Sequence, residues 1–215
     1  MLTYNEVQKF YDSFGRKQDK QFYEESAIND LIKKGNFGEA KNIVEFGCGT
    51  GKLASRLLKN ILSNNCQYLG VDISQTMIAL CEKNLKQYSD RSKCYKNEGE
   101  PRIDIPDQSA DRFISTYVLD LLAEKDILTL LNEAYRILLP GGCLCLASLT
   151  HGVSLISHIV ETIWNSLYKL KPSIVGGCHP IKLSEYLLSD KWHIIHDSVI
   201  VSYGVPSEVV IAKRL

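Results

Sequence analysis

The sequence predicts an α/β fold in which a mostly parallel sheet carries helices on both faces. Short apolar runs alternate along the chain with amphipathic helical patterns, as expected for parallel strands joined by helices. The first of these units contains a glycine-rich turn, and the second apolar run ends on an acid, Asp72. With 215 residues and 45% hydrophobic content, the chain is long enough for one substantial core, so we expect a single soluble domain over residues 1–215.

The glycine-rich turn joins a predicted strand, residues 42–46, to a predicted helix, residues 52–62. It contains three glycines, Gly47, Gly49 and Gly51. Glycines remove side chains where the backbone bends sharply and a ligand approaches it, and we expect the N–H groups that follow to be free to hold a polar group. Asp72, at the end of the second strand, is placed to accept hydrogen bonds from both hydroxyls of a ribose. Together these features predict a nucleoside-cofactor site.

The spacing of the glycines separates two cofactor classes. The dinucleotide fingerprint G-x-G-x-x-G would place its third glycine at the position of Lys52. The chain instead has G-x-G-x-G, with Glu45 two residues before the first glycine. At these residues it resembles the class I S-adenosylmethionine-dependent methyltransferases, most nearly the small-molecule enzymes of the ubiquinone-biosynthesis type. The resemblance implies a Rossmann-like sheet of seven strands in the order 3-2-1-4-5-7-6, with the last strand antiparallel.

The resemblance also implies that the cofactor is S-adenosylmethionine and that its product is S-adenosylhomocysteine. The glycine loop, which includes Cys48, would wrap the methionine part of the cofactor, and Glu45 would reach its amino group. Asp72 would bind the ribose, while Ile73 and Met77 would border the adenine.

A turn after the third predicted strand, residues 92–97, would contact the adenine amino group in the resembled family. Gly99 and Glu100 occupy the expected positions, although the family pattern has aspartate after the glycine, and spacing alone leaves Glu98 open as well. A solvent-facing acidic turn explains the same residues.

Residues 1–38 are predicted to form a helical cap before the first strand. Apolar residues share one helical stripe that Gly15 ends, and a second helix is predicted from about residue 17 to residue 34. In the resembled family such helices fold over the cofactor, which makes Tyr11 and Lys17 candidate substrate residues. The alternative is an aromatic stripe packed on the core.

The middle of the chain continues the alternation of strands and helices. Ser74 is a predicted helix N-cap directly after the second strand. A fourth strand is predicted over residues 111–115, and we expect Asp111 to be structural, accepting hydrogen bonds from nearby backbone N–H groups. Tyr117 follows the carboxyl end of this strand, where open α/β sheets bind ligands, and is a candidate for contact with both cofactor and substrate.

The cofactor-binding core is assigned to residues 40–150. Its last units are a predicted helix over residues 127–138, ended by the segment 140–142, and a fifth strand over residues 143–148.

Residues 151–215 are assigned to the substrate side. We predict a helix over residues 153–171 that is suited to a pocket wall or lid, and a short helix over residues 182–188. We also predict a closing pair of strands, residues 192–201 and 209–213, joined through residues 204–206. His151 and His179 are candidate catalytic bases because histidine titrates near neutral pH, although either can be an exposed loop residue.

Charge narrows the choice of partners. The 25 basic and 25 acidic residues cancel, which argues against a large surface for nucleic acid or an anionic membrane. The sequence also lacks both the Asn/Asp-Pro-Pro-aromatic run of amino-methylating nucleic-acid enzymes and the Pro-Cys pair of cytosine-C5 enzymes. We therefore expect a small-molecule acceptor and no nucleic-acid partner. No apolar run approaches the ~20 residues needed to span a bilayer.

The seven cysteines form no C-x-x-C pair, and no secretory signal precedes them, which favours a reducing cytoplasm over a disulfide scaffold. Cys143 and Cys145 alternate along the predicted fifth strand and should point to one face. We expect buried thiols there rather than metal ligands, and no metal cofactor.

The expected function is transfer of the sulfonium methyl to an oxygen, nitrogen or carbon of a small molecule by in-line displacement. The protein would align the nucleophile, methyl carbon and sulfur and exclude water. Two alternatives remain. A non-catalytic cofactor-binding or partner-binding domain would lack an open pocket over the methyl group, and a nicotinamide-dependent oxidoreductase is contradicted by Lys52.

Overall fold

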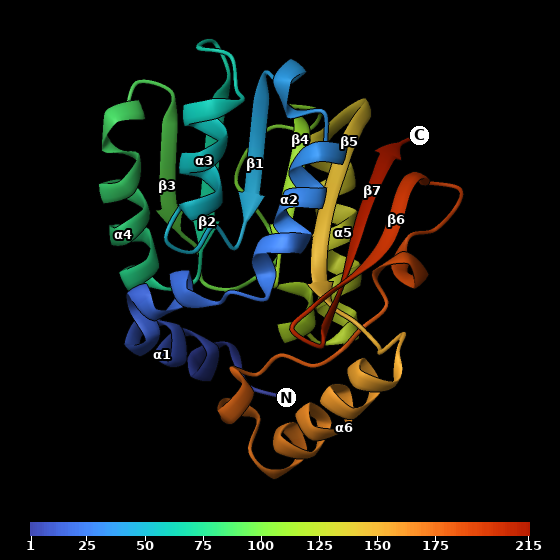
Figure 1. Ribbon diagram of the computed structural model, residues 1–215. Coiled ribbons are helices and arrows are strands. Elements are labelled where there is room, and N and C mark those ends of the chain that lie inside the picture. The colour runs from blue at the N-terminus through green and yellow to red at the C-terminus, as the bar shows by residue number, and fades with distance from the viewer.

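A single mixed sheet organises the chain. The computed structural model describes residues 1–215, apart from the side chain of Lys17. Among the described residues, seven strands form a sheet in the order β3-β2-β1-β4-β5-β7-β6. β7 runs antiparallel to both of its neighbours, and the other pairs are parallel. Figure 1 shows the sheet and its helices. The predicted α/β class, strand order and antiparallel last strand are confirmed.

The strands are β1 (Asn42–Phe46), β2 (Gln67–Asp72), β3 (Ser92–Lys96), β4 (Ala110–Thr116), β5 (Leu138–Leu149), β6 (Trp192–Ser202) and β7 (Val205–Arg214). The prediction for β5 was too short. This strand begins at Leu138, and Pro140 and the two glycines after it lie within it, where the pairing with β4 shifts register. An irregular strand can accommodate proline and glycine at such a bulge.

The turn between β6 and β7 also differs from its prediction. Ser202 pairs with Val205, so Tyr203 and Gly204 alone form the turn, and Val205 and Pro206 already belong to β7. Both turn residues have positive φ, 53° and 82°, as a tight two-residue hairpin turn requires.

The helices are α1 (Tyr4–Phe14), α2 (Glu24–Lys34), α3 (Lys52–Asn60), α4 (Gln75–Leu85), α5 (Glu124–Ile137) and α6 (Leu155–Leu170). Short 3₁₀ turns are η1 (Gly15–Lys20), η2 (Phe37–Glu39), η3 (Lys86–Tyr88), η4 (Leu119–Leu121), η5 (Pro172–Val175) and η6 (Leu183–Tyr186). The predicted N-cap is confirmed, because the Ser74 hydroxyl accepts the Met77 N–H.

Two helix predictions were wrong. The second helix begins at Glu24, because the polar segment before it forms η1 and has no apolar stripe to bury as a helix. The predicted short helix over residues 182–188 is only the turn η6, where the Glu208 carboxylate accepts the Leu183 N–H at 2.6 Å and holds the backbone in place.

Helices cover both faces of the sheet and form two cores. α2, α3 and α4 lie over one face, toward the viewer in Figure 1, and α5 lies behind the other. Alternation along β5 divides its side chains between these cores, with Cys143 and Cys145 both buried in the core on the side of α2, α3 and α4, and Leu144 and Leu146 on the α5 side. The two alternating thiols therefore share one face, as predicted.

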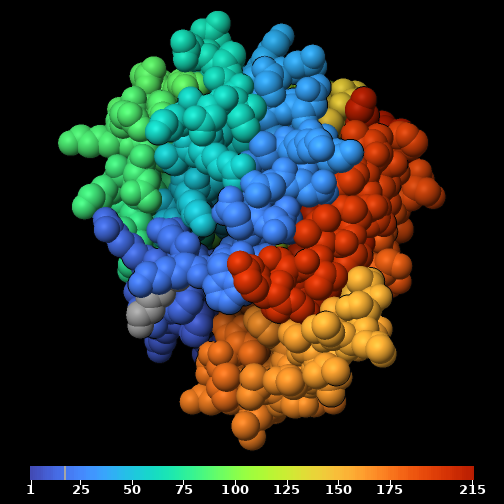
Figure 2. Space-filling view, in the orientation of Figure 1, coloured from blue at the N-terminus to red at the C-terminus, as the bar shows by residue number. Residues whose placement is uncertain are grey.

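α1 and α6 lie across the carboxyl ends of the parallel strands (Figure 1). The N-terminal segment and the segment around α6 close this end of the molecule in Figure 2. α6 turns an apolar face to solvent, with Ile156, Ile159 and Ile163 exposed by 69%, 61% and 56%. Along the described chain, no helix has both the length and the apolar character to cross a bilayer.

Asp111 has the structural role that its position predicts. One carboxylate oxygen accepts hydrogen bonds from the N–H groups of Lys41 and Asn42, at 2.8 and 3.0 Å, where the chain enters β1. The other lies 3.2 Å from the guanidinium of Arg112, whose side chain is buried. The carboxylate thus joins the starts of β1 and β4.

Replacement of Asp111 by alanine should lower the free energy of unfolding by about 1–3 kcal/mol, because two backbone donors and a buried guanidinium lose their acceptor. Urea denaturation of the two proteins measures this difference. Asp107→Ala is the matched control, since its exposed carboxylate makes only a surface ion pair with Arg136 and should change stability by less than about 1 kcal/mol. Equal losses in both variants would contradict the structural role of Asp111.

Candidate functional site

Two cavities meet at the glycine loop, at the carboxyl ends of β1, β2 and β4. The first has a volume of about 400 Å³ and the second about 270 Å³. Five residues line both of them: Gln18, Gly47, Gly49, Thr116 and Tyr117. An elongated ligand can therefore cross the glycine loop and occupy both cavities, which is the arrangement expected at the edge of an open α/β sheet.

The glycine loop is held by its own N–H groups, which corrects the expectation that they are free. The N–H groups of Gly47 and Cys48 donate to the Val71 carbonyl at 2.8 and 3.0 Å, and that of Gly51 donates to the Cys48 carbonyl at 2.9 Å. All three glycines have positive φ. A Cβ on Gly47 would lie 2.2 Å from the Val118 side chain, whereas one on Gly49 would meet open space. The loop therefore serves mainly by its shape.

Asp72 lies at the centre of this arrangement. One of its carboxylate oxygens accepts the Gly49 N–H at 2.9 Å, and the other accepts the Ser74 N–H at 2.9 Å. Burial raises the pKa of this carboxyl, while the two backbone donors oppose the rise. Its oxygens keep further lone pairs for a ligand in the first cavity, which Asp72 lines.

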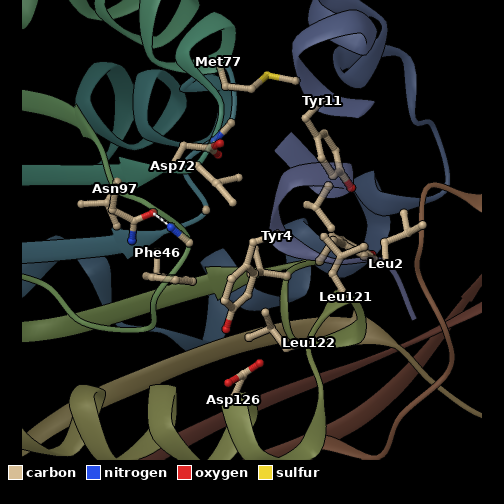
Figure 3. Close-up of a pocket in the computed structure, with 18 of the residues that line it drawn as sticks. Leu2, Tyr4, Tyr11, Phe46, Asp72, Met77, Asn97, Leu121, Leu122 and Asp126 are labelled. Carbon is tan, nitrogen blue, oxygen red and sulfur yellow. Dashed lines mark hydrogen bonds between the residues drawn. The ribbon is translucent and has the colours of Figure 1, made fainter. Parts of the chain in front are cut away.

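Ile73, Met77 and Gly99 line the first cavity, as expected for residues that border an adenine. Glu100 is exposed and lines neither cavity. Asn97, which was not predicted, lines the first cavity instead, and its side-chain oxygen accepts the Gly99 N–H at 3.1 Å (Figure 3). The signal for Asn97 was its position directly after β3, where side chains of a parallel sheet reach the ligand.

α1 covers the first cavity at the carboxyl ends of the parallel strands. The Asp12 carboxylate accepts the Ser74 hydroxyl at 2.5 Å and the Thr76 N–H at 3.2 Å, which fastens α1 to the start of α4. Tyr4 and Tyr11 both line the cavity, and Tyr4 points toward Asp126 in Figure 3. Burial and this carboxylate raise the pKa of Tyr4 to about 12.

The candidate substrate residue Tyr11 thus lies at the cavity, while the side chain of Lys17 lies outside the described part of the structure. Tyr4 was not among the predicted site residues, although it occupies the same helix face as Tyr11.

Two acids with raised pKa, the buried Glu45 and the half-buried Glu24, line the second cavity. Glu45 is only 2% exposed, and its carboxylate accepts the Tyr68 hydroxyl at 2.5 Å. Burial raises the pKa of Glu45 to about 8, against the opposing effect of that hydrogen bond. Burial and the neighbouring Asp120 raise the pKa of Glu24, which lines the same cavity, to about 8 as well. The raised pKa values mean that ionising these carboxyl groups is costly, and a cationic group bound here would lower that cost by stabilising the ionised carboxylates.

Tyr117 lies where the cavities join. Its φ of 55° is unusual for a bulky residue, and the conformation is held by a hydrogen bond from its N–H to the Ala147 carbonyl and one from its hydroxyl to Ser207, at 2.8 and 2.9 Å. Backbone strain of this kind clusters at ligand sites.

The two histidines are placed elsewhere. His151 lines neither cavity, and its Nδ1 lies 2.7 Å from the Glu161 carboxylate on an exposed surface. His179 packs against the Tyr168 ring, 5.5 Å between centroids, and burial lowers the pKa of its imidazole. Gly51 also lines neither cavity and caps α3 instead.

Comparison with known proteins agrees with this geometry. Residues 43–142 match the family model described as a methyltransferase domain. The carboxy-S-adenosyl-L-methionine synthase of Shewanella sediminis (strain HAW-EB3) is 30% identical over 148 residues, which cover 60% of each chain. The chain thus spans less than two thirds of the length of this curated relative.

Two solved structures share the fold. An S-adenosylmethionine-dependent methyltransferase from Methanosarcina mazei superposes with a TM-score of 0.66 at 18% identity, covering 86% of this chain and 97% of that one. A geranyl diphosphate methyltransferase in complex with GPP and sinefungin superposes with a TM-score of 0.68 at 13% identity, covering 88% of this chain and 77% of that one.

The raised pKa of Glu45 makes stability depend on pH. Between the ordinary pKa of a glutamate and about 8, the folded state holds a proton that the unfolded state releases, so stability falls as pH rises through this window. Glu45→Gln removes this penalty, since its amide oxygen can still accept the Tyr68 hydroxyl. The variant should be as stable as the wild type near pH 4 and more stable by about 2–4 kcal/mol at pH 9.

Thermal and urea unfolding at pH 4, 7 and 9 measure this divergence. Glu98→Gln is the control, because the Glu98 side chain is 82% exposed and its replacement should follow the wild type at every pH. A constant difference between Glu45→Gln and the wild type across the range would show that Glu45 is not protonated in the folded protein.

Proposed function

Residues 43–142 match the model of the methyltransferase-domain family, and we propose that this chain is a member of it that transfers a methyl group from S-adenosylmethionine to a small molecule. The observation that carries the proposal is the pair of cavities that join across the glycine loop beside Asp72. Their residues fit the three parts of the cofactor, which differ in chemistry.

The first cavity suits the adenosine part. The Asp72 carboxylate keeps lone pairs for the ribose hydroxyls, and the apolar side chains of Ile73 and Met77 suit the faces of an adenine. The Asn97 amide offers hydrogen bonds to the edge of the base. These contacts are inferred from the lining of the cavity.

The second cavity suits the methionine part. Glu45 is buried and Glu24 is half-buried, and a nearby ammonium or sulfonium group would favour the ionisation of both. Gly49 has open space where a side chain would otherwise stand, so the chain of the cofactor can pass over the loop close to its backbone.

The bound cofactor would supply an activated sulfonium methyl. The protein then has to hold the acceptor in line with that methyl and exclude water. Its contribution to the rate is therefore mainly the positioning of the reacting groups. Tyr117, rigidly held at the junction of the cavities, is suited to border the reacting atoms. Neither histidine borders the cavities, and the proposal assigns them no catalytic role.

We infer that the acceptor is a small molecule with an apolar body. The part of the first cavity under α1 is lined by apolar side chains, among them Val7, Leu121 and Leu122, with the Tyr11 ring beside them. The equal numbers of acidic and basic residues support a small molecule rather than nucleic acid.

A second candidate is the reaction of the curated relatives, which are named for making carboxy-S-adenosyl-L-methionine. Their sequence identity favours it, but this chain covers only part of their length. Mass spectrometry separates the two candidates, because methyl transfer yields S-adenosylhomocysteine and a methylated acceptor, whereas the second yields a heavier cofactor.

The seven cysteines are free thiols, which supports our proposal that the protein acts in a reducing compartment such as the cytoplasm.

Isothermal titration with S-adenosylmethionine tests the cofactor. The wild type should bind with micromolar affinity, and Asp72→Ala should bind at least about 10-fold more weakly, since a charged hydrogen-bond acceptor is lost. Asp90→Ala, an exposed acid at the opposite end of the sheet, should bind as the wild type does. Binding of NAD in place of S-adenosylmethionine, or of neither, would refute the proposal.

Cofactor binding should release a proton near pH 7. Glu45 is largely protonated there and must ionise to accept a hydrogen bond from the cofactor ammonium. Titrations in buffers of different ionisation enthalpy measure the proton count, and Glu45→Gln should reduce it. An unchanged count in the variant would remove Glu45 from the proposed contact with the cofactor.

A further inference from the structure

Three cysteines from separate elements come together beneath the glycine loop. Cys48 lies in the loop itself, Cys81 in α4 and Cys94 in β3, and their sulfur atoms all lie within 4.8 Å of one another. Cys48 and Cys81 are buried, with 5% and 0% exposure, whereas Cys94 is half-buried on the strand at the edge of the sheet. An ion can therefore reach the cluster from the side of Cys94.

The backbone around the cluster leaves space for the sulfur atoms. A Cβ on Gly51 would lie 2.9 Å from the Cys81 sulfur, and one on Gly70 would lie 3.0 Å from the Cys48 sulfur. A side chain at Gly51 would displace the Cys81 thiol, and one at Gly70 would displace the Cys48 thiol. The glycines thus permit a close grouping of sulfur atoms that neighbouring side chains would prevent.

The thiolate is the form of cysteine that binds metals, so each of these sulfur atoms that becomes a ligand gives up its proton.

The number and softness of the ligands select the ion. Zinc in structural sites takes four ligands almost without exception. In the described part of the chain, the group able to hold a metal consists of these three cysteines, without a histidine or carboxylate as a fourth member. Soft thiolate ligands suit Cu(I), which does not require tetrahedral coordination.

We propose that Cys48, Cys81 and Cys94 form a three-sulfur binding site for a soft monovalent metal ion of the Cu(I) class. The ion enters beside Cys94, and the thiols that become ligands release their protons to solvent, with no change in the oxidation state of metal or sulfur. Since Cys48 belongs to the glycine loop, the bound ion connects that loop to α4 and β3. The site does not depend on the proposed methyltransferase activity.

Anaerobic titration of the reduced full chain with Cu(I), supplied as its acetonitrile complex, tests the site. A near-ultraviolet charge-transfer band from sulfur to copper should saturate at one equivalent, and the bound protein should unfold at a higher temperature. In competition with a chromophoric Cu(I) chelator, Cys94→Ser should bind at least about 10-fold more weakly, since even indirect ligand contacts have effects of this size.

Cys66→Ser is the matched control, because Cys66 is a buried thiol outside the cluster and should leave the affinity for Cu(I) unchanged. Cys81→Ala provides a second test on a different element and should also weaken binding. Circular dichroism of the metal-free proteins establishes that each variant is folded. Equal affinity in the wild type, Cys94→Ser and Cys81→Ala, or no stoichiometric binding by the wild type, would overturn the proposal.

Discussion

The Asp72 carboxylate is the interaction on which the rest of the site depends. Its two oxygens accept the N–H groups of Gly49 and Ser74, so one side chain connects the glycine loop, the end of β2 and the start of α4. Asp12 binds the same helix start from α1, which brings the N-terminal helix over the first cavity. The residue proposed to bind a ribose therefore also holds the glycine loop and the start of α4 in place beside the first cavity.

Buried acids give the site its electrostatic character. Burial raises the pKa of Glu45 and Glu24 to about 8 and that of Asp120 to about 7, which means that ionising them inside the folded protein is costly. Without a ligand these groups reduce stability at alkaline pH. A cationic ligand would offset the cost of ionising these acids, so the same residues would link the stability of the fold to ligand binding. Loss of stability at a functional site is common in proteins.

Much of the fold was predictable because its signals are local. The α/β class, the N-cap at Ser74 and the structural role of Asp111 followed from periodicity, capping chemistry and strand position, whereas the strand order followed from the family resemblance carried by the glycine loop. Errors arose where a distant contact overrides a local pattern. Glu208 holds the backbone at Leu183 in a short turn, and β4 draws the start of β5 into an irregular strand. Asn97 was missed because its one signal, the position directly after β3, does not show which residue of the following turn lines the cavity.

The sequence by itself determined the α/β class, the glycine loop and the acid that follows it, since these depend on spacing along a few consecutive residues. Only the tertiary structure decided which side chains meet. The pairing of Glu45 with Tyr68 and the grouping of Cys48, Cys81 and Cys94 depend on strand register and helix packing across dozens of residues. The physical reason is that side-chain chemistry acts over a few ångströms, and the folded sheet alone brings such distant positions within that range.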